Sequence, residues 1–289
     1  MKTRISRSIR LATLGFATTG ALMAGTAAQA QEQGTVNLAY VEWSSEVAST
    51  NVIAAVLEQA GYEVNLTSLS AAAMFQALST GDADAIVAAW LPTTHADYME
   101  RVGDSVEDLG PNLNGTKLGL VVPDYTDVDS ITELNDNAEL FDGEIIGIDP
   151  GAGLMGVTEE AVDTYDLDLR LRSGSDATMV AALSNAINNE EDIVVTSWTP
   201  HWMFARWDLK YLEDPEGVFG GDEQIHTVVR NGFADEMPEA YAILDAFEWT
   251  PDQMGEVMLM NQEDGSDPYE NAKQWVEENQ DVVEQWLDS

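Results

Sequence analysis

Three tryptophans stand where they could bind a positively charged group. Trp43 follows an apolar, strand-like segment, and Trp90 and Trp198 end two similar stretches of sequence at equivalent places. The face of an indole ring attracts cations, and this is the main specific grip on a quaternary ammonium, which has no hydrogen to donate. Three converging indoles would form a cage for such a group. The alternatives are an apolar or sugar ligand, or plain packing in the core, which is expected for the other tryptophans.

A glycine-containing turn offers a partner for a negative charge. Asp149-Pro-Gly-Ala-Gly-Leu154 follows a predicted strand and precedes a predicted helix. The backbone N–H groups of Gly153 and Leu154 would therefore lie at the positive end of the helix dipole. His95, on the loop after Trp90, could add a side-chain donor, and His201 competes for that role. A tight turn without a ligand and a surface histidine are the alternatives.

The chain has no motif typical of a catalytic, metal or cofactor site. It has no cysteine, which excludes disulfides, thiolate metal sites, cysteine nucleophiles and a lipid-anchored cysteine. His95 and Asp97 are too few to hold a metal, and there is no nucleophile elbow or Walker loop. We expect no catalytic residue, no metal and no cofactor. The remote alternative is a secreted hydrolase that uses His95 or His201 with nearby carboxylates.

Acidic residues far outnumber basic ones. The chain has 52 Asp and Glu against 12 Lys and Arg, a formal net charge of −40, which repels phosphate backbones and anionic membranes. Nucleic acids are therefore excluded as partners, and anionic membranes are equally poor ones. Such an excess of carboxylates is tolerated when salt screens their repulsion. We interpret it as adaptation to high salt, with an ordinary acidic exported protein as the alternative.

Residues 1–30 carry the features of a secretory signal peptide. Basic residues in the first ten positions precede an apolar run over 11–27, and Ala28-Gln29-Ala30 is a small-x-small cleavage pattern. We expect cleavage after Ala30 and a soluble periplasmic protein that is not lipid-anchored. A transmembrane anchor is the alternative, although the apolar run is short for a bilayer and diluted by Thr and Gly.

The elements that would carry the candidate residues form two similar halves. In each half, strands alternate with helices, a pattern typical of parallel β-α-β units, and ligands bind outside the carboxyl ends of such strands. Two small halves predict two lobes that face one another: residues 31–118 with 228–289 as lobe I, and residues 119–227 as lobe II. The predicted strands are 36–41, 62–66, 85–89, 117–122, 144–148, 169–172, 192–196 and 225–229, and the predicted helices are 51–60, 71–78, 154–164, 177–187, 254–260 and 269–287.

Several segments occur together in the chain, among them Ala39-Tyr-Val-Glu-Trp43, Ala89-Trp-Leu-Pro-Thr-Thr-His95, Gly147-Ile-Asp-Pro-Gly-Ala-Gly-Leu-Met155 and Trp198-Thr-Pro-His-Trp-Met-Phe204. In combination they resemble the glycine betaine/proline betaine substrate-binding component of osmoprotective ABC importers. The resemblance implies an α/β chain with the two-lobed periplasmic-binding-protein fold, each lobe a mostly parallel sheet flanked by helices. It also implies a role for each candidate residue: Trp43, Trp90 and Trp198 surround a trimethylammonium group, and Gly153, Leu154 and His95 bind a carboxylate.

The same resemblance implies a function without catalysis. The protein would capture glycine betaine and proline betaine, small zwitterions with a quaternary ammonium, and deliver them to an ABC permease in the inner membrane for osmoprotection. Choline, trimethylamine N-oxide and dimethylsulfoniopropionate are the alternative ligands, and docking to a sensor is an alternative to docking to a permease. Choline lacks a carboxylate and would leave the donors of the anion site unpaired. We expect a monomer.

Overall fold

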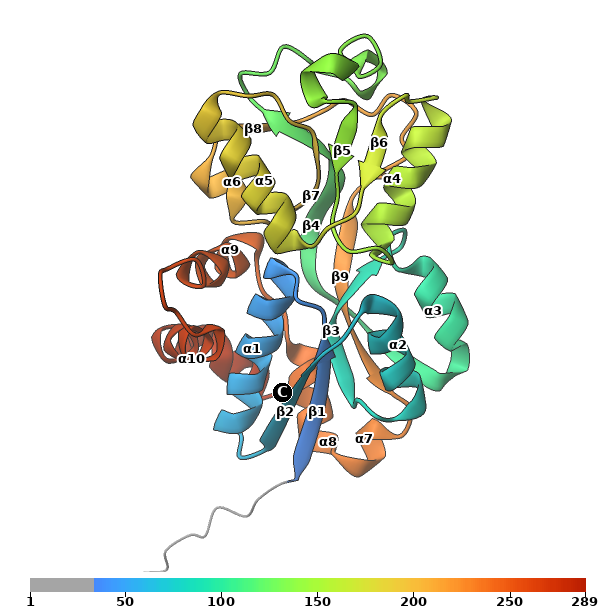
Figure 1. Ribbon diagram of the computed structural model, residues 1–289. Helices are drawn as coiled ribbons and strands as arrows, with labels where there is room; N and C mark the ends of the chain where they lie inside the picture. The colour runs from blue at the N-terminus through green and yellow to red at the C-terminus, as the bar shows by residue number, and fades with distance from the viewer. Residues whose placement is uncertain (1–33) are drawn as a thin grey trace, which may run out of the picture. The chain divides into compact units, whose positions relative to one another are not determined.

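The computed structural model describes residues 34–289 (Figure 1), so the predicted signal peptide lies outside the described residues. The first β-α-β-α-β unit forms a parallel arrangement in which β1 lies between β2 and β3. The alternation of apolar strands and helices predicted this unit, although the first helix begins at Ser44 and not at residue 51. Its elements are β1 (Thr35–Tyr40), α1 (Ser44–Gln59), β2 (Glu63–Ser68), α2 (Ala71–Thr80) and β3 (Ala85–Leu91).

The second unit repeats this arrangement. Here β5 lies between β6 and β7, and both pairings are parallel, which confirms the predicted repeat of parallel β-α-β units. The last strand begins three residues later than predicted and runs through Trp198. Its elements are β5 (Glu144–Ile146), α4 (Gly153–Thr164), β6 (Arg170–Arg172), α5 (Asp176–Asn189) and β7 (Val195–Thr199).

Two strands join the units into one path of hydrogen-bonded strands. β9 (Glu223–Arg230) pairs antiparallel with β3 and with the first part of β4 (Val106–Pro123). The second part of β4 pairs with β7 and with β8 (Leu209–Tyr211). We call the half that contains β1, β2, β3 and β9 lobe I, and the half that contains β5, β6, β7 and β8 lobe II. The residue boundaries of the lobes stay a prediction.

The first half of β4 was missed by the sequence analysis, which predicted a strand only over residues 117–122. Gly110, Pro111 and Gly115 interrupt this part of the chain, and such residues usually indicate turns. In the structure the segment stays in the sheet because its register with β9 shifts at three places, and these irregularities accommodate the turn residues.

The carboxyl-terminal helices pack on lobe I, where α10 contacts α1 (Figure 1). Residues 269–287 form two helices and not the single predicted one, because the chain bends at Asn279. Among the described residues, no helix combines the length and apolar character needed to span a membrane. The remaining α-helices are α3 (Ala96–Val102), α6 (Met203–Arg206), α7 (Phe233–Glu236), α8 (Pro238–Ala246), α9 (Pro251–Met260), α10 (Pro268–Glu278) and α11 (Gln280–Leu287).

The two units place the three candidate tryptophans at the carboxyl ends of parallel strands. Trp90 and Trp198 are the penultimate residues of β3 and β7, and Trp43 immediately precedes α1 after β1. In each unit the first strand lies between the other two: β1 between β2 and β3, and β5 between β6 and β7. This strand order opens a crevice at the carboxyl edge of the sheet. The carboxyl edges of the two units both contribute residues to one cavity.

Candidate ligand-binding site

A cavity lies between the carboxyl edges of the two lobes, and the space free of protein atoms within it and at its opening to solvent is about 300 Å³. All six residues predicted to bind a ligand line it, and the remaining lining residues are small or apolar with two hydroxyls. The lining residues are Trp43, Ser45, Trp90, Thr94, His95, Leu118, Ile148, Ala152, Gly153, Leu154 and Trp198. Their common location brings together segments that are far apart in the sequence.

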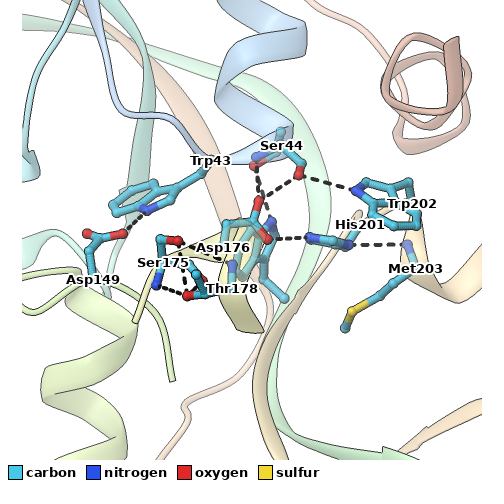
Figure 2. Close-up of polar contacts among 11 residues, drawn as sticks. Trp43, Ser44, Asp149, Ser175, Asp176, Thr178, His201, Trp202 and Met203 are labelled. Atoms are coloured by element: carbon cyan, nitrogen blue, oxygen red, sulfur yellow. Dashed lines mark hydrogen bonds and ion pairs between the residues drawn. The ribbon is translucent and has the colours of Figure 1, made fainter. Parts of the chain in front are cut away.

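The indole N–H groups of two of the tryptophans are held by residues of the opposite lobe. Trp43 of lobe I donates its Nε1–H to Oδ1 of Asp149 in lobe II over 2.7 Å (Figure 2). Trp198 of lobe II donates its Nε1–H to Oγ of Ser45 in lobe I over 3.2 Å. The polar edge of each ring thus has a protein acceptor, which leaves the ring available for an apolar or cationic group.

His95 presents an unused hydrogen-bond donor in this cavity. Its Nδ1 accepts the backbone N–H of Trp90 over 3.0 Å, so the proton of the neutral ring is on Nε2. The imidazole is fully buried, and Nε2 has no partner among the described residues. Burial lowers the pKa of His95 to about 4. The ring is therefore a neutral donor near pH 7, and its N–H lacks an acceptor.

Packing and hydrogen bonds fix the ring of His95 and the loop before it. The imidazole stacks on Trp43 with 6.0 Å between ring centroids and meets the Phe75 ring edge-on at 5.4 Å. Glu223, a buried residue of β9, accepts the backbone N–H groups of Thr93 and Thr94, both over 2.7 Å. These hydrogen bonds anchor the loop between β3 and α3 to the neighbouring strand β9. Together with the ring packing, they fix the direction of the Nε2–H of His95.

The first turn of α4 supplies two further donors. Gly153 and Leu154 are the first two residues of the helix, so their N–H groups have no acceptor in a preceding turn. No backbone hydrogen bond from either is found within residues 34–289. A Cβ atom on Gly153 would lie 2.1 Å from the carbonyl oxygen of Thr94. Glycine is required there because the helix start of lobe II meets the backbone of lobe I.

The residues around the cavity carry no formal charge. Tryptophan, serine, threonine and aliphatic side chains surround it, and its histidine is neutral near pH 7. A single charge transferred from water into such surroundings is costly unless it is paired. The geometry therefore suits a molecule that is neutral overall, with a cationic part among the indoles and an anionic part at the three N–H donors.

The structure separates the other two histidines from this cavity. His201 is buried, but its Nε2 lies 3.1 Å from Oδ1 of Asp176, outside the lining. His226 pairs with Asp108 through Nδ1 at 2.8 Å. The competing prediction that His201 binds an anion is therefore not supported by its position, because its donor is already used.

Sequence reasoning missed the residues that hold the candidate side chains in place. Ser45, Asp149 and Glu223 act on partners that are distant along the chain; Trp43 and Asp149, for example, are 106 positions apart. Asp149 had one available signal, since it occupies the position in the second repeat that corresponds to Trp43 in the first. Glu223 had none, because nothing in the sequence of β9 points to the loop that it binds.

The chain resembles several proteins of known function. Residues 34–278 match the family described as the substrate binding domain of the ABC-type glycine betaine transport system. The crystal structure of lactococcal OpuAC, closed and complexed with glycine betaine, is 45% identical, with a TM-score of 0.84 over 88% of this chain and 99% of that chain. An ABC-transporter choline binding protein in complex with choline is 28% identical, with a TM-score of 0.81 over 88% of this chain and 91% of its own.

A curated relative extends the comparison. The glycine betaine/carnitine transport binding protein GbuC of Listeria monocytogenes is 47% identical over 156 residues, which are 53% of this chain and 52% of the listerial protein. The match thus spans about half the length of that relative. The likeness to the lactococcal structure confirms the predicted α/β periplasmic-binding-protein fold, and the family is one of transport binding proteins and not of enzymes. The chain belongs to the family of substrate-binding domains of ABC-type glycine betaine transport systems.

Proposed function

We propose that this protein captures glycine betaine, and with it proline betaine, between its two lobes and delivers it to an ABC permease of the inner membrane for osmoprotection. The observation that carries the proposal is the Nε2–H of His95, which has no acceptor within residues 34–289 and shares an uncharged cavity with three indoles and with two backbone N–H groups that are likewise unpaired there. Buried donors are costly when left unsatisfied. A carboxylate would satisfy all three, and the indoles would receive the trimethylammonium group.

Choline is less well matched to this cavity than a betaine. It carries the same trimethylammonium group but has a hydroxyl where betaine has a carboxylate. One hydroxyl can accept fewer of the three N–H donors, and the cation would enter a cavity lined by residues without formal charge. Trimethylamine N-oxide and dimethylsulfoniopropionate remain alternative ligands. Carnitine joins them because the listerial relative is named for it, and it also combines a trimethylammonium group with a carboxylate.

The cellular context of the proposal follows from the sequence. A signal peptide over residues 1–30 would export the chain, and the mature protein would act in the periplasm as a monomer. The net charge of −40 fits an organism that lives in high salt and must import compatible solutes. A zwitterion also suits so acidic a protein, because a ligand of zero net charge does not compete with the cations that gather around the surface.

Thermal unfolding of the mature protein in molar salt tests the ligand class. Samples contain glycine betaine, proline betaine, carnitine, choline, trimethylamine N-oxide or, as a control, maltose. A ligand at about 100 times its dissociation constant adds ~2.7 kcal/mol to the free energy of unfolding, which raises the melting temperature by roughly 5–10 °C for a protein of this size.

The pattern of shifts decides among the candidates. A shift with zwitterionic betaines and none with maltose is the expected result. An equal shift with choline would keep the indole cage and remove the carboxylate from the recognition. The proposal is refuted if no quaternary amine raises the melting temperature.

A further inference from the structure

A buried hydrogen-bond cluster joins the lobes beside the ligand cavity (Figure 2). Asp176, the first residue of α5 in lobe II, is 3% exposed. Its Oδ2 accepts the backbone N–H of Ser44 over 2.8 Å and the Oγ–H of Ser44 over 2.6 Å. Ser44 is the first residue of α1 in lobe I. A carboxylate of one lobe therefore receives two hydrogen bonds from a single residue of the other.

The other hydrogen bonds of the cluster come from His201 and Trp202 of lobe II. Nδ1 of His201 accepts the backbone N–H of Met203 over 3.2 Å, so the neutral ring carries its proton on Nε2 and donates it to Oδ1 of Asp176 over 3.1 Å. Trp202 donates its indole N–H to Oγ of Ser44 over 3.3 Å. Burial by itself would raise the pKa of Asp176, but the hydrogen bonds from His201 and Ser44 outweigh it and hold this pKa below its ordinary value.

Three consecutive residues of lobe I thus make hydrogen bonds with lobe II. Trp43 donates to Asp149, Ser44 donates to Asp176, and Ser45 accepts from the indole of Trp198. Trp43 and Ser45 line the ligand cavity, whereas Ser44 faces a separate groove that Asp176 and Trp202 also line. No side chain of the cluster lines the cavity, but the ring of His201 meets the cavity residue Trp198 edge-on, with 4.8 Å between ring centroids. The cluster therefore lies between the cavity and the separate groove.

We propose that Ser44 and Asp176 form a clasp that holds the lobes closed, and that this clasp sets how long the protein retains its ligand. Asp176 is in this sense a positioning residue, since it acts through the closed arrangement of the lobes and not through contact with the ligand. The inference rests on the proposed function for the identity of the ligand, glycine betaine. The clasp itself needs only that the two lobes separate when the ligand leaves.

The conservative variant Asp176→Asn breaks the clasp with little change of volume. Three N–H or O–H donors converge on the two carboxylate oxygens. An amide has only one oxygen, so its NH₂ group must face either Ser44 or His201, and each of these already presents a hydrogen. His201 cannot move its proton to Nδ1 without meeting the N–H of Met203. Ser44→Ala removes one of the two hydrogen bonds from lobe I to Asp176 and the acceptor of the Trp202 indole. It changes no residue of lobe II, so it remains informative if Asp176→Asn impairs folding.

Single-molecule energy transfer measures closure of the lobes directly. Fluorophores can be attached at two chosen positions because the chain has no cysteine of its own. Fluorophores are attached to Ala72→Cys on α2 and Thr164→Cys on α4, which are exposed and lie on different lobes. Closed dwell times are recorded with and without glycine betaine, and stopped-flow mixing gives the association and dissociation rates. Asp163→Asn is the matched control, since Asp163 is an exposed carboxylate of α4 outside the clasp.

We expect Ser44→Ala and Asp176→Asn to shorten closed dwell times and to raise the dissociation rate by about tenfold or more, which corresponds to losing one hydrogen bond to a charged group. The association rate should change by less than about threefold, and the double variant should lose much less than the product of the two single losses. Asp163→Asn should behave as wild type.

Two other outcomes are distinguishable. If wild type does not close on glycine betaine, the proposed function is wrong, and the clasp is then judged by the closed dwell times of unliganded molecules. If both variants keep the closed dwell times of wild type, the clasp is refuted. A lowered melting temperature of unliganded Asp176→Asn together with unchanged dwell times would assign the cluster to the stability of lobe II alone.

Discussion

Replacement of His95 by phenylalanine separates recognition of the carboxylate from recognition of the ammonium. Phenylalanine keeps an aromatic ring that can pack between Trp43 and Phe75, whereas it removes the Nε2–H donor. A hydrogen bond to a charged group contributes about 1.5–3 kcal/mol. Its loss should weaken glycine betaine binding by a factor of roughly 10 to 150.

Choline serves as the internal reference for this experiment. The variant also removes the Nδ1 acceptor of the Trp90 N–H, and any resulting damage to the loop or the cage affects both ligands. Isothermal titration of wild type and His95→Phe with each ligand gives the factor by which the variant weakens that ligand. The factor for betaine divided by the factor for choline is the contribution of the carboxylate. We expect betaine to lose at least about tenfold more affinity than choline.

The matched control is His226→Ala, which removes a histidine that pairs with Asp108 on the sheet and lies outside the cavity. It should leave both affinities unchanged. The reasoning is refuted if His95→Phe weakens betaine and choline by the same factor, because the histidine would then support the loop and not contact the carboxylate.

Four other expectations follow from the same site. Trp90→Ala or Trp198→Ala should each weaken every quaternary ammonium ligand by about thirtyfold, near 2 kcal/mol, in the same titrations. Gly153→Ala should abolish binding of all ligands without lowering the melting temperature of the unliganded protein, since its Cβ would lie 2.1 Å from the Thr94 carbonyl oxygen and hold the lobes apart. Burial lowers the pKa of His95 to about 4. Below pH ~6.5 this histidine is therefore protonated in the unfolded state but stays neutral in the folded state until the pH falls to about 4. The free energy of unfolding should therefore fall by up to ~1.4 kcal/mol per pH unit between pH ~6.5 and about 4, and denaturant titrations should show a smaller fall for His95→Phe. Denaturant titrations should also show higher stability in molar salt than in dilute buffer, because salt screens the repulsion of 52 acidic residues; equal stability would contradict the interpretation of salt adaptation.

Local patterns in the chain predicted the order of the elements and the positions of the indoles within them. Apolar runs with period 2 or 3.6 report local burial, so the strands and helices of both repeats were predicted within a few residues, except that the first helix begins at Ser44 and not at residue 51. Prediction failed where local signals conflict with long-range pairing. Gly110, Pro111 and Gly115 read as turns, yet β9 holds this segment in the sheet through shifts of register. Asn279, which divides the last predicted helix, gave no comparable warning.

The assembly of the site depends on contacts between segments that are distant in the chain. The free N–H of His95 depends on a backbone donor that fixes its tautomer, and the need for glycine at position 153 depends on the approach of Thr94 from the other lobe. Ser44 and Asp176 meet across 132 positions of sequence. Hydrogen bonds between such distant residues cannot be predicted from periodicity, because the apolar pattern around each partner indicates only the helix or strand to which that residue belongs. Residue types and spacing thus indicated which groups could bind a zwitterion, and the packing of two lobes determined which of their donors remain free to do so.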